Sequence, residues 1–264
     1  MTGGPAGFRS CEAARRPPAW WQHLILPACL AVPLVVWWWA GGDGWMWAGA
    51  VLAAGMAVTV LARIAAVVAG LFAPPPLAAT PAADNAAALP RYSILVPLYD
   101  EAAVVPSLLA ALGDLRYPRD RFEALLLVEV DDDATRAALA AHALPPGLRV
   151  ITVPDGQPRT KPRACNHGLA QATGELVVIF DAEDRPEPDQ LLRAAGAFAH
   201  QPGEVACLQA RLQADRRGRG APAIGFALDY AAWFDLYLPG LYALGAPIPL
   251  GGTSNHFRAD ALRS

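Results

Sequence analysis

The feature that most constrains the fold is a stretch over residues 20–72 that carries only two formally charged side chains. A turn-forming Gly41-Gly42-Asp43-Gly44 divides this stretch into two apolar runs, 20–40 and 45–64. An α-helix of about 20 apolar residues is long enough to cross the hydrocarbon of a bilayer. The stretch therefore predicts a hairpin of two transmembrane helices.

Charges at the ends of this hairpin predict its orientation. Three arginines lie in the 1–19 tail and Arg63 closes the second run, whereas the connecting turn holds only Asp43. Because positive charge favours the cytoplasmic side, both outer ends are expected in the cytoplasm, with the protein a multi-pass component of the inner membrane. A cleaved signal peptide is the alternative, which Trp38-Trp39 disfavours because a cleavage site needs small residues.

The composition excludes one broad class of partner. The net charge is −3 and no run of Lys and Arg is interleaved with aromatic residues, so nothing indicates a nucleic-acid surface. The four cysteines include no C-x-x-C pair, which indicates neither a zinc site nor a disulfide framework and favours a reducing compartment.

A Pro- and Ala-rich linker over residues 73–90 is expected to lead into a globular domain over residues 91–264. In this domain short apolar runs alternate with Ala- and Leu-rich helical stretches, which predicts an α/β fold with a mostly parallel sheet covered on both faces. The expected strands are Ser93–Pro97, Ala124–Val130, Arg149–Val153, Leu176–Phe180 and Val205–Leu212. The expected helices are Glu101–Leu112, Asp133–His142, Lys161–Ala172 and Pro188–His200.

Acidic residues end or follow three of the expected strands, at the ends where ligands bind in parallel sheets. They are Asp100 and Glu101, then Glu129 with Asp131, Asp132 and Asp133, and finally Asp181, Glu183 and Asp184. Carboxylates gathered at one edge repel each other unless a cation lies among them. The pattern predicts a divalent metal, Mg²⁺ or Mn²⁺, held between carboxylates and substrate phosphate.

Cations open the helix expected at 161–172, beside the same edge. Lys161 and Arg163 lie in its first turn and Arg159 directly precedes it. A helix N-terminus with cations is a plausible diphosphate site. The chain has no Walker-type phosphate loop and no dinucleotide fingerprint, so the nucleotide must be held in another way.

Four segments, in this order and spacing, resemble the membrane-bound family 2 glycosyltransferases with the Rossmann-like GT-A fold, cellulose-synthase-like in layout. Val96-Pro97-Leu98-Tyr99-Asp100-Glu101 resembles the opening V-P-x-Y-N-E, and Asp131-Asp132-Asp133-Ala134-Thr135 resembles D-D-x-S-x-D-x-T. The segment 160–169 is similar to G-K-x-x-A-L-N-x-G-L, and Asp181-Ala182-Glu183 stands where the D-x-D metal motif stands. Gly251 to Arg258 is similar to the acceptor-side segment of the same enzymes.

The resemblance implies roles for particular residues. Pro97, Tyr99 and Glu101 would line the nucleoside pocket. Glu129 would contact the base and ribose; the alignment with the family motif leaves a shift of one or two residues open, so Asp131 can take this place instead. Lys161 would neutralise the diphosphate of a nucleotide-diphosphate sugar, a UDP-sugar first. Asp181 would hold the metal with Glu183, or with Asp184 instead. The remaining substrate-binding candidates are Asn166, Gly252, Thr253, Ser254 and Arg258.

The implied reaction is an inverting transfer of the sugar to a polysaccharide or lipid-linked acceptor, and it needs a carboxylate base. In the family this base lies in a T-E-D-like triplet past the acceptor-side segment, and no Thr-Glu-Asp occurs in this sequence. Asp260 is the one late carboxylate, and its setting is that of an ordinary acid in a following helix. The base is therefore expected beyond Ser264, in a chain that is incomplete at its carboxyl end, binds the nucleotide-sugar and transfers poorly.

Other interpretations stand beside these. Asp132 and Asp133 are better explained as caps of the following helix, and His167 and His256 as hydrogen-bonded structural residues. The aromatic stretch from Phe226 to Tyr237 has helical spacing and fits an interfacial helix in contact with membrane lipid, a core helix or a sugar platform. The alternative functions are a silent membrane scaffold or partner subunit and a metal-dependent nucleotidyltransferase.

Overall fold

The computed structural model describes residues 22–73, 89–213 and 220–263. The expected 1–19 tail, most of the expected 73–90 linker and the terminal Ser264 of the expected 91–264 domain lie outside these ranges. The chain forms two compact units: one combines residues 1–74 with 213–248, and the other combines residues 75–212 with 249–264.

The first unit is helical. It contains α2 (Gln22–Trp39), the 3₁₀ turn η1 (Gly41–Asp43), α3 (Gly44–Leu71), α8 (Ala221–Ala232), the π-helical η3 (Trp233–Tyr237) and α9 (Leu238–Ala243). The region Gly41–Leu71 is the one helix, in the part of the chain that the structure describes, long and apolar enough to cross a membrane. It extends beyond the predicted run 45–64. The α2 helix covers the other predicted run, and a second membrane crossing stays a prediction.

Small residues let α3 approach the later helices of its unit closely. A Cβ added to Gly70 would lie 1.9 Å from the carbonyl oxygen of Leu236, and one added to Gly240 would lie 1.7 Å from that of Ala66. These backbones are therefore in direct contact, as they are where small residues line helix interfaces in membranes.

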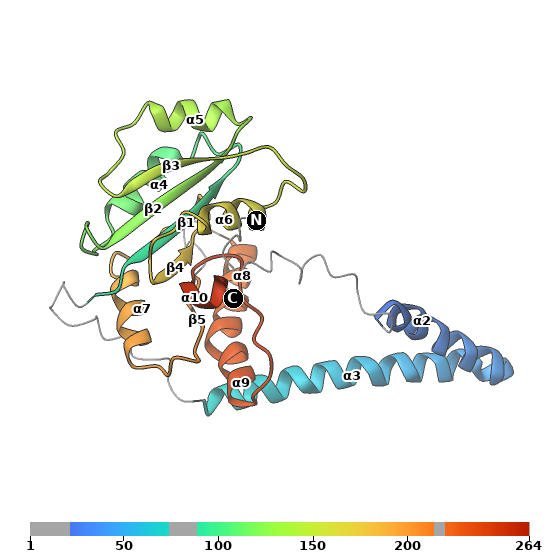
Figure 1. The fold of residues 1–264 in the computed structure, drawn as a ribbon. Coiled ribbons are helices and arrows are strands. Elements are labelled where there is room, and N and C mark those ends of the chain that lie inside the picture. Colours follow the sequence, from blue (N-terminus) through green and yellow to red (C-terminus); the bar gives the residue numbers. More distant parts are fainter. Residues whose placement is uncertain (1–21, 74–88, 214–219, 264) are drawn as a thin grey trace, which may run out of the picture. The chain divides into compact units, whose positions relative to one another are not determined.

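The second unit is an α/β domain with a six-stranded sheet in the order β3-β2-β1-β4-β6-β5 (Figure 1). Strands β1 (Tyr92–Leu98), β2 (Phe122–Glu129), β3 (Leu148–Val153) and β4 (Leu176–Ile179) run parallel. Strand β6 (Asn255–Arg258) runs antiparallel to both β4 and β5 (Cys207–Gln209). The helices are α4 (Val105–Gly113), α5 (Asp133–Ala140), α6 (Lys161–Leu169), α7 (Gln190–Ala199) and α10 (Ala259–Arg263).

Helices cover both faces of the sheet. Alternate residues of β1, such as Ile94 and Val96, pack with α4, α5 and α7 in one core, whereas Leu95 packs with α6 and α10 in the other. Burial on both faces explains why the central strands are continuous apolar runs. The predicted α/β class with a mostly parallel sheet is confirmed.

The predicted elements agree with the structure for the first four strands, whose bounds differ by at most two residues. The prediction of a strand over Val205–Leu212 was too long, because only 207–209 pair with a neighbour. Strand β6 was not predicted, because its four residues include Asn255, His256 and Arg258 and do not form an apolar run.

His256 lies in a buried polar network, as predicted for a structural histidine. Its Nδ1 lies 2.6 Å from the Tyr92 hydroxyl, and its Nε2 lies 3.1 Å from Nε2 of Gln190. The network joins β6, β1 and α7 across the core that faces α7. Burial lowers the pKa of His256 from 6.5 to about 4, so the imidazole is neutral in the folded protein at neutral pH. The structural role predicted for His167 is also confirmed, since its ring contacts the Gln171 amide at 3.2 Å.

This pKa predicts an acid-sensitive fold. Between pH 6.5 and about 4 the unfolded chain protonates His256 and the folded chain does not, so the free energy of unfolding falls as the pH drops, by up to about 1.4 kcal/mol per pH unit. Urea unfolding of the detergent-solubilised His256→Gln variant should therefore show a flatter pH dependence than wild type in this window. The exposed His142→Gln variant is the control, and an unchanged slope in His256→Gln would contradict the prediction.

Candidate functional site

Topology brings the acidic segments to one edge of the sheet. Strand β1 lies between β2 and β4 and is parallel to both, so the residues that follow these three strands lie at the same, carboxyl edge. Strand β6 runs the opposite way and therefore starts at this edge, with Asn255 opposite Ile179. The segment 251–254 thus lies beside the loop that begins at Asp181.

Electrostatics show that three of these loops converge. The pKa of Glu101 is raised by burial first and then by the negative charges of Glu183, Asp100, Asp181 and Asp132. These carboxylates come from the loops after β1, β2 and β4. The three acidic segments therefore lie together at one edge of the sheet, as predicted.

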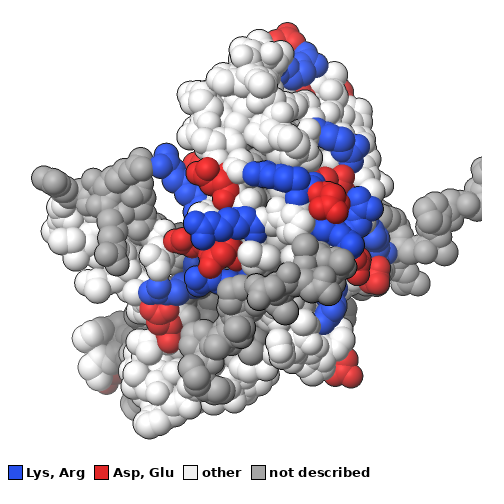
Figure 2. Space-filling view, turned by 90° about the vertical axis from the view of Figure 1, so that its left-hand side faces the viewer, with Lys and Arg blue, Asp and Glu red and all other residues white. Residues whose placement is uncertain are grey.

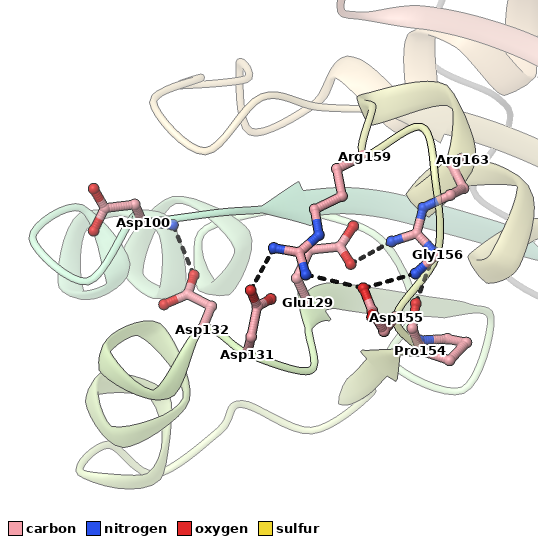
Figure 3. A network of polar contacts seen from close by, with 9 residues as sticks. All are labelled: Asp100, Glu129, Asp131, Asp132, Pro154, Asp155, Gly156, Arg159 and Arg163. Atoms are coloured by element: carbon pink, nitrogen blue, oxygen red, sulfur yellow. Dashed lines mark hydrogen bonds and ion pairs between the residues drawn. The ribbon is translucent and has the colours of Figure 1, made fainter.

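Asp132 organises the loop after β1. Its side chain caps α5 by accepting a hydrogen bond from the Thr135 N–H at 3.0 Å, and it also accepts one from the Asp100 N–H at 2.7 Å (Figure 3). Burial alone would raise the pKa of Asp132, but these hydrogen bonds lower it overall. Asp100 has a positive φ of 57°, an uncommon conformation for a residue with a side chain. The capping role predicted for Asp132 is confirmed.

The first turn of α6 supplies cations to two of the three loops. Lys161 pairs with Asp181, and its Nζ also donates to the Gly252 carbonyl at 2.5 Å. Arg163 donates to Glu129 at 2.5 Å and to the Pro154 carbonyl at 2.7 Å (Figure 3). One helix turn therefore connects the ends of β2 and β4, which lie on either side of β1.

Two carboxylates at the carboxyl end of β2, Glu129 and Asp131, differ in exposure. The side chain of Glu129 is 7% exposed and paired with Arg163, whereas that of Asp131 is 43% exposed and paired with Arg159. Arg159 also contacts Asp155 at 2.9 Å, so it lies between two exposed carboxylates (Figure 3). Figure 2 shows such basic and acidic side chains beside one another on one face. Of the two carboxylates, Asp131 is the more accessible to a ligand.

The predicted metal residues are arranged unequally. The carboxylate of Asp184 accepts hydrogen bonds from the Asp181 N–H at 2.7 Å and from the Thr253 hydroxyl, and burial raises its pKa. Asp184 therefore fastens the β4 loop to the segment before β6. Asp181 is half-buried and Glu183 is exposed, so these two carboxylates remain at the surface of the edge.

The described residues include no group of three or more His, Cys, Asp or Glu side chains arranged to hold a metal ion. A cation held by Asp181 can complete its coordination with oxygen atoms of water or of a substrate. Mg²⁺ and Mn²⁺ accept such mixed coordination by one or two carboxylates and phosphate oxygens. The donor set thus fits a metal that arrives with a diphosphate.

The segment before β6 is held tightly at the edge. Ser254 has a positive φ of 55°, and its N–H donates to the Ile179 carbonyl at 2.8 Å. Thr253 and Ser254 are buried, whereas Gly252 is exposed. Non-glycine residues with this conformation cluster at functional sites, and here Asp100 and Ser254 flank the same edge.

The other predicted site residues lie in different environments. Tyr99 is exposed at the end of β1, Pro97 is half-buried within that strand, and Asn166 is half-buried in the second turn of α6.

Arg258 and Asp260 are not brought to the site. Arg258 pairs with Leu176 at the opposite edge of the sheet, where its guanidinium contacts the carbonyls of Val205 and Phe198 and lies 4.9 Å from the Phe198 ring centroid. Asp260 follows it in α10, which begins where the Ala259 N–H donates to the Glu175 carbonyl.

Two residues of the site were not singled out from the sequence. The Thr135 hydroxyl accepts a hydrogen bond from the Glu101 N–H at 3.0 Å, and Asp155 binds Arg159. Thr135 closes the D-D-D-A-T motif, so its position in the motif was a usable signal. Asp155 lies in a loop with no signal of its own.

The protein has a mostly parallel sheet with charged loops over its carboxyl edge, and in open α/β sheets this is the edge where ligands bind. Residues 93–254 match the sequence profile of glycosyl transferase family 2, so the chain belongs to this family. The predicted family, with its GT-A type of α/β fold, is thereby confirmed.

Individual relatives match shorter segments. The chain is 30% identical to the probable glycosyltransferase YdaM of Bacillus subtilis over 39% of this chain and 25% of that protein. It is 28% identical to the beta-monoglucosyldiacylglycerol synthase of Synechocystis over 73% of this chain and 38% of that protein. The solved mannosyltransferase PcManGT of Pyrobaculum calidifontis, in complex with GDP-Man and Mn²⁺, is 27% identical over 61% of this chain and 47% of its own, with a TM-score of 0.47. The chain thus spans less than half the length of these relatives.

The Arg163–Glu129 pair predicts a stability effect. Arg163→Met leaves the Glu129 carboxylate buried without its cation, which should lower the free energy of unfolding by about 3–5 kcal/mol. The control is Arg149→Met, which breaks an ion pair whose arginine is half exposed and should cost less than about 1 kcal/mol. Adding Glu129→Gln to Arg163→Met should restore part of the loss in urea unfolding. Equal losses for Arg163→Met and Arg149→Met would show that burial does not set the strength of these pairs.

Proposed function

We propose that the chain binds a nucleotide-diphosphate sugar, first a UDP-sugar, at the carboxyl edge of its sheet, as part of an inverting glycosyltransferase. The observation that carries the proposal is the convergence of Lys161, Asp181 and the Gly252 carbonyl at one point. A lysine at a helix N-terminus beside carboxylates fits a diphosphate and its counter-ion. Membership of family 2 supports the reaction class.

Residues of the neighbouring loops take the nucleoside in this proposal. Tyr99 is exposed at the end of β1 and Glu101 follows it, so an aromatic face and a carboxylate are available beside Pro97. Asp131 is the accessible carboxylate after β2 and takes the ribose or base. Glu129 is buried on Arg163 and positions the first turn of α6.

Asp181 and Glu183 would hold Mg²⁺ or Mn²⁺ together with the diphosphate. Such a cation stabilises negative charge on the leaving diphosphate when it is bound. The Lys161 ammonium supplies positive charge at the same point. When substrate binds, its partner changes from the Asp181 carboxylate to the phosphate oxygens. Asp184 has a different task, since it keeps the Thr253 segment beside the β4 loop.

An inverting transfer also needs a carboxylate that removes the proton of the acceptor hydroxyl. We do not assign this role to Asp260, because it lies at the opposite edge of the sheet. A base beyond Ser264 stays a prediction. Equal transfer rates for this chain and for a version extended at its carboxyl end would show that the base lies within it.

The sugar is transferred to a lipid-linked acceptor or a growing polysaccharide in this proposal. Relatives named for glucosyldiacylglycerol and glucomannan synthesis support both choices.

The site is proposed to face the cytoplasm from the inner membrane. Support comes from the apolar helix Gly41–Leu71 and from the arginines that flank the two apolar runs. The α2 and α3 helices would both cross the bilayer, with η1 on the outer side.

Calorimetry tests the proposed site directly. Wild type should bind UDP in Mn²⁺ and lose most of this affinity in EDTA. Lys161→Met should weaken binding about tenfold to a hundredfold, since it removes a charge-assisted contact with the diphosphate. Asp181→Asn should remove the dependence of UDP affinity on Mn²⁺, because it replaces the carboxylate that holds the cation with a neutral amide.

Asp114→Asn is the matched control, since this exposed residue follows α4 outside the site. If the wild-type chain binds neither UDP nor GDP in the presence of Mn²⁺, the proposal fails and a silent scaffold becomes the better description. Equal UDP affinity in Mn²⁺ and in EDTA would contradict only the proposed metal site.

A further inference from the structure

Two amide side chains form a cross-strand pair at the edge of the sheet that carries the candidate site. Gln209, the last residue of β5, lies directly opposite Asn255, the first residue of β6. Asn255 in turn lies opposite Ile179, two residues before Asp181. Directly paired residues of antiparallel strands point to the same face, so the two amides lie side by side.

The face they occupy is the one covered by α6. Ile179 packs in the core with residues of α6, whereas His256, the next residue of β6, contacts Tyr92 and Gln190 on the other face. Because side chains alternate along a strand, Asn255 and Gln209 lie on the α6 face. Lys161 projects from the first turn of this helix and contacts Gly252.

Both amides hold a buried polar atom that has no hydrogen-bond partner among the described residues. Asn255 is 5% exposed; its Nδ2 donates to the Gly251 carbonyl at 2.5 Å, which leaves its Oδ1 as an unpaired acceptor. Nε2 of Gln209 is an unpaired donor, and it lies 3.2 Å from the point where a Cβ on Gly251 would be. Buried polar atoms almost always have partners, either protein groups or ordered water, so this donor and this acceptor mark a place that fits a group able both to donate and to accept.

The two unpaired atoms have complementary polarity. A metal ion would find only one oxygen, and a phosphate would meet an acceptor at Oδ1 as well as a donor at Nε2. A sugar hydroxyl both donates and accepts, so one hydroxyl satisfies both atoms. We propose that Gln209 and Asn255 form a subsite that binds a hydroxyl group of a sugar, with Gly251 keeping the space beside Nε2 open.

This subsite rests on the proposed function, since it adds sugar recognition to the nucleotide site. The sugar is either that of the donor or that at the end of the acceptor, and the chemistry of the contact is the same. The experiment must therefore separate the nucleotide from the sugar and the donor from the acceptor.

Calorimetry on the detergent-solubilised chain in Mn²⁺ makes both separations. Gln209→Met keeps the length of the side chain and removes the donor, and Gln209→Glu is a second variant for the case that the first does not fold. Affinity for UDP should stay within about twofold of wild type, while affinity for UDP-glucose, UDP-GlcNAc or GDP-mannose should fall about fivefold to tenfold. If the acceptor occupies the subsite, affinity for cellotetraose, mannotetraose or glucosyldiacylglycerol in micelles should fall instead.

Gln201→Met is the control, since this residue follows α7 away from the site. Unchanged affinity for every sugar-containing probe overturns the subsite, and so does an equal loss for UDP and for the UDP-sugars, which would mean that Gln209 only supports the Gly251 segment. If wild type binds no nucleoside diphosphate, the proposed function fails and the subsite falls with it. If wild type binds UDP and only the Gln209 variants lose affinity for the sugar-containing probes, both the proposed function and the subsite are supported.

Discussion

The ion pairs made by the first turn of α6 hold the candidate site together. Lys161 reaches the loop after β4 and Arg163 reaches the end of β2, so one helix turn ties together two strand ends that flank β1. Without these cations, several carboxylates would share one edge and repel each other. Burial first, and then such neighbouring negative charges, already raise the pKa of Glu101. Positive and negative side chains therefore neutralise each other at this edge. A diphosphate that arrives with a metal cation can take over the contacts of Lys161 and Asp181, because it brings charges of both signs.

The two ion pairs have different physical consequences. Arg163 and Glu129 are largely buried, so breaking one partner leaves a charge in a medium of low dielectric constant. Lys161 and Asp181 are each about one-third exposed, so solvent can replace either partner at small cost. The first pair is suited to fixing geometry and the second to exchange with a ligand. In one helix turn, Arg163 thus positions the end of β2, whereas Lys161 is available to bind a ligand.

The sequence predicted the framework of the fold better than the contacts of its site. Strands β1 to β4 are continuous apolar runs, and their parallel pairing follows from the intervening helices, so the acidic segments had to meet at one edge. Strand β6 gave no such signal, and without its direction Arg258 could not be placed at the opposite edge from Asn255. Nor could spacing show that Arg163 binds Glu129, or that Asp184 accepts a hydrogen bond from Thr253, because these contacts join segments far apart in the chain.

The antiparallel direction of β6 also explains how one short strand serves two purposes. Its first residue lies at the charged edge with an unsatisfied amide, its second is a buried neutral histidine in the core, and its last pins the far edge through Arg258. A one-residue shift of this strand would move His256 to the other face, away from Tyr92 and Gln190, and would take Arg258 from the carbonyls of Val205 and Phe198. The position of Asn255 is thereby determined by contacts made elsewhere in the strand. This rigidity is what a hydroxyl-binding amide requires, because its selectivity depends on a donor and an acceptor that stay in place before the sugar arrives.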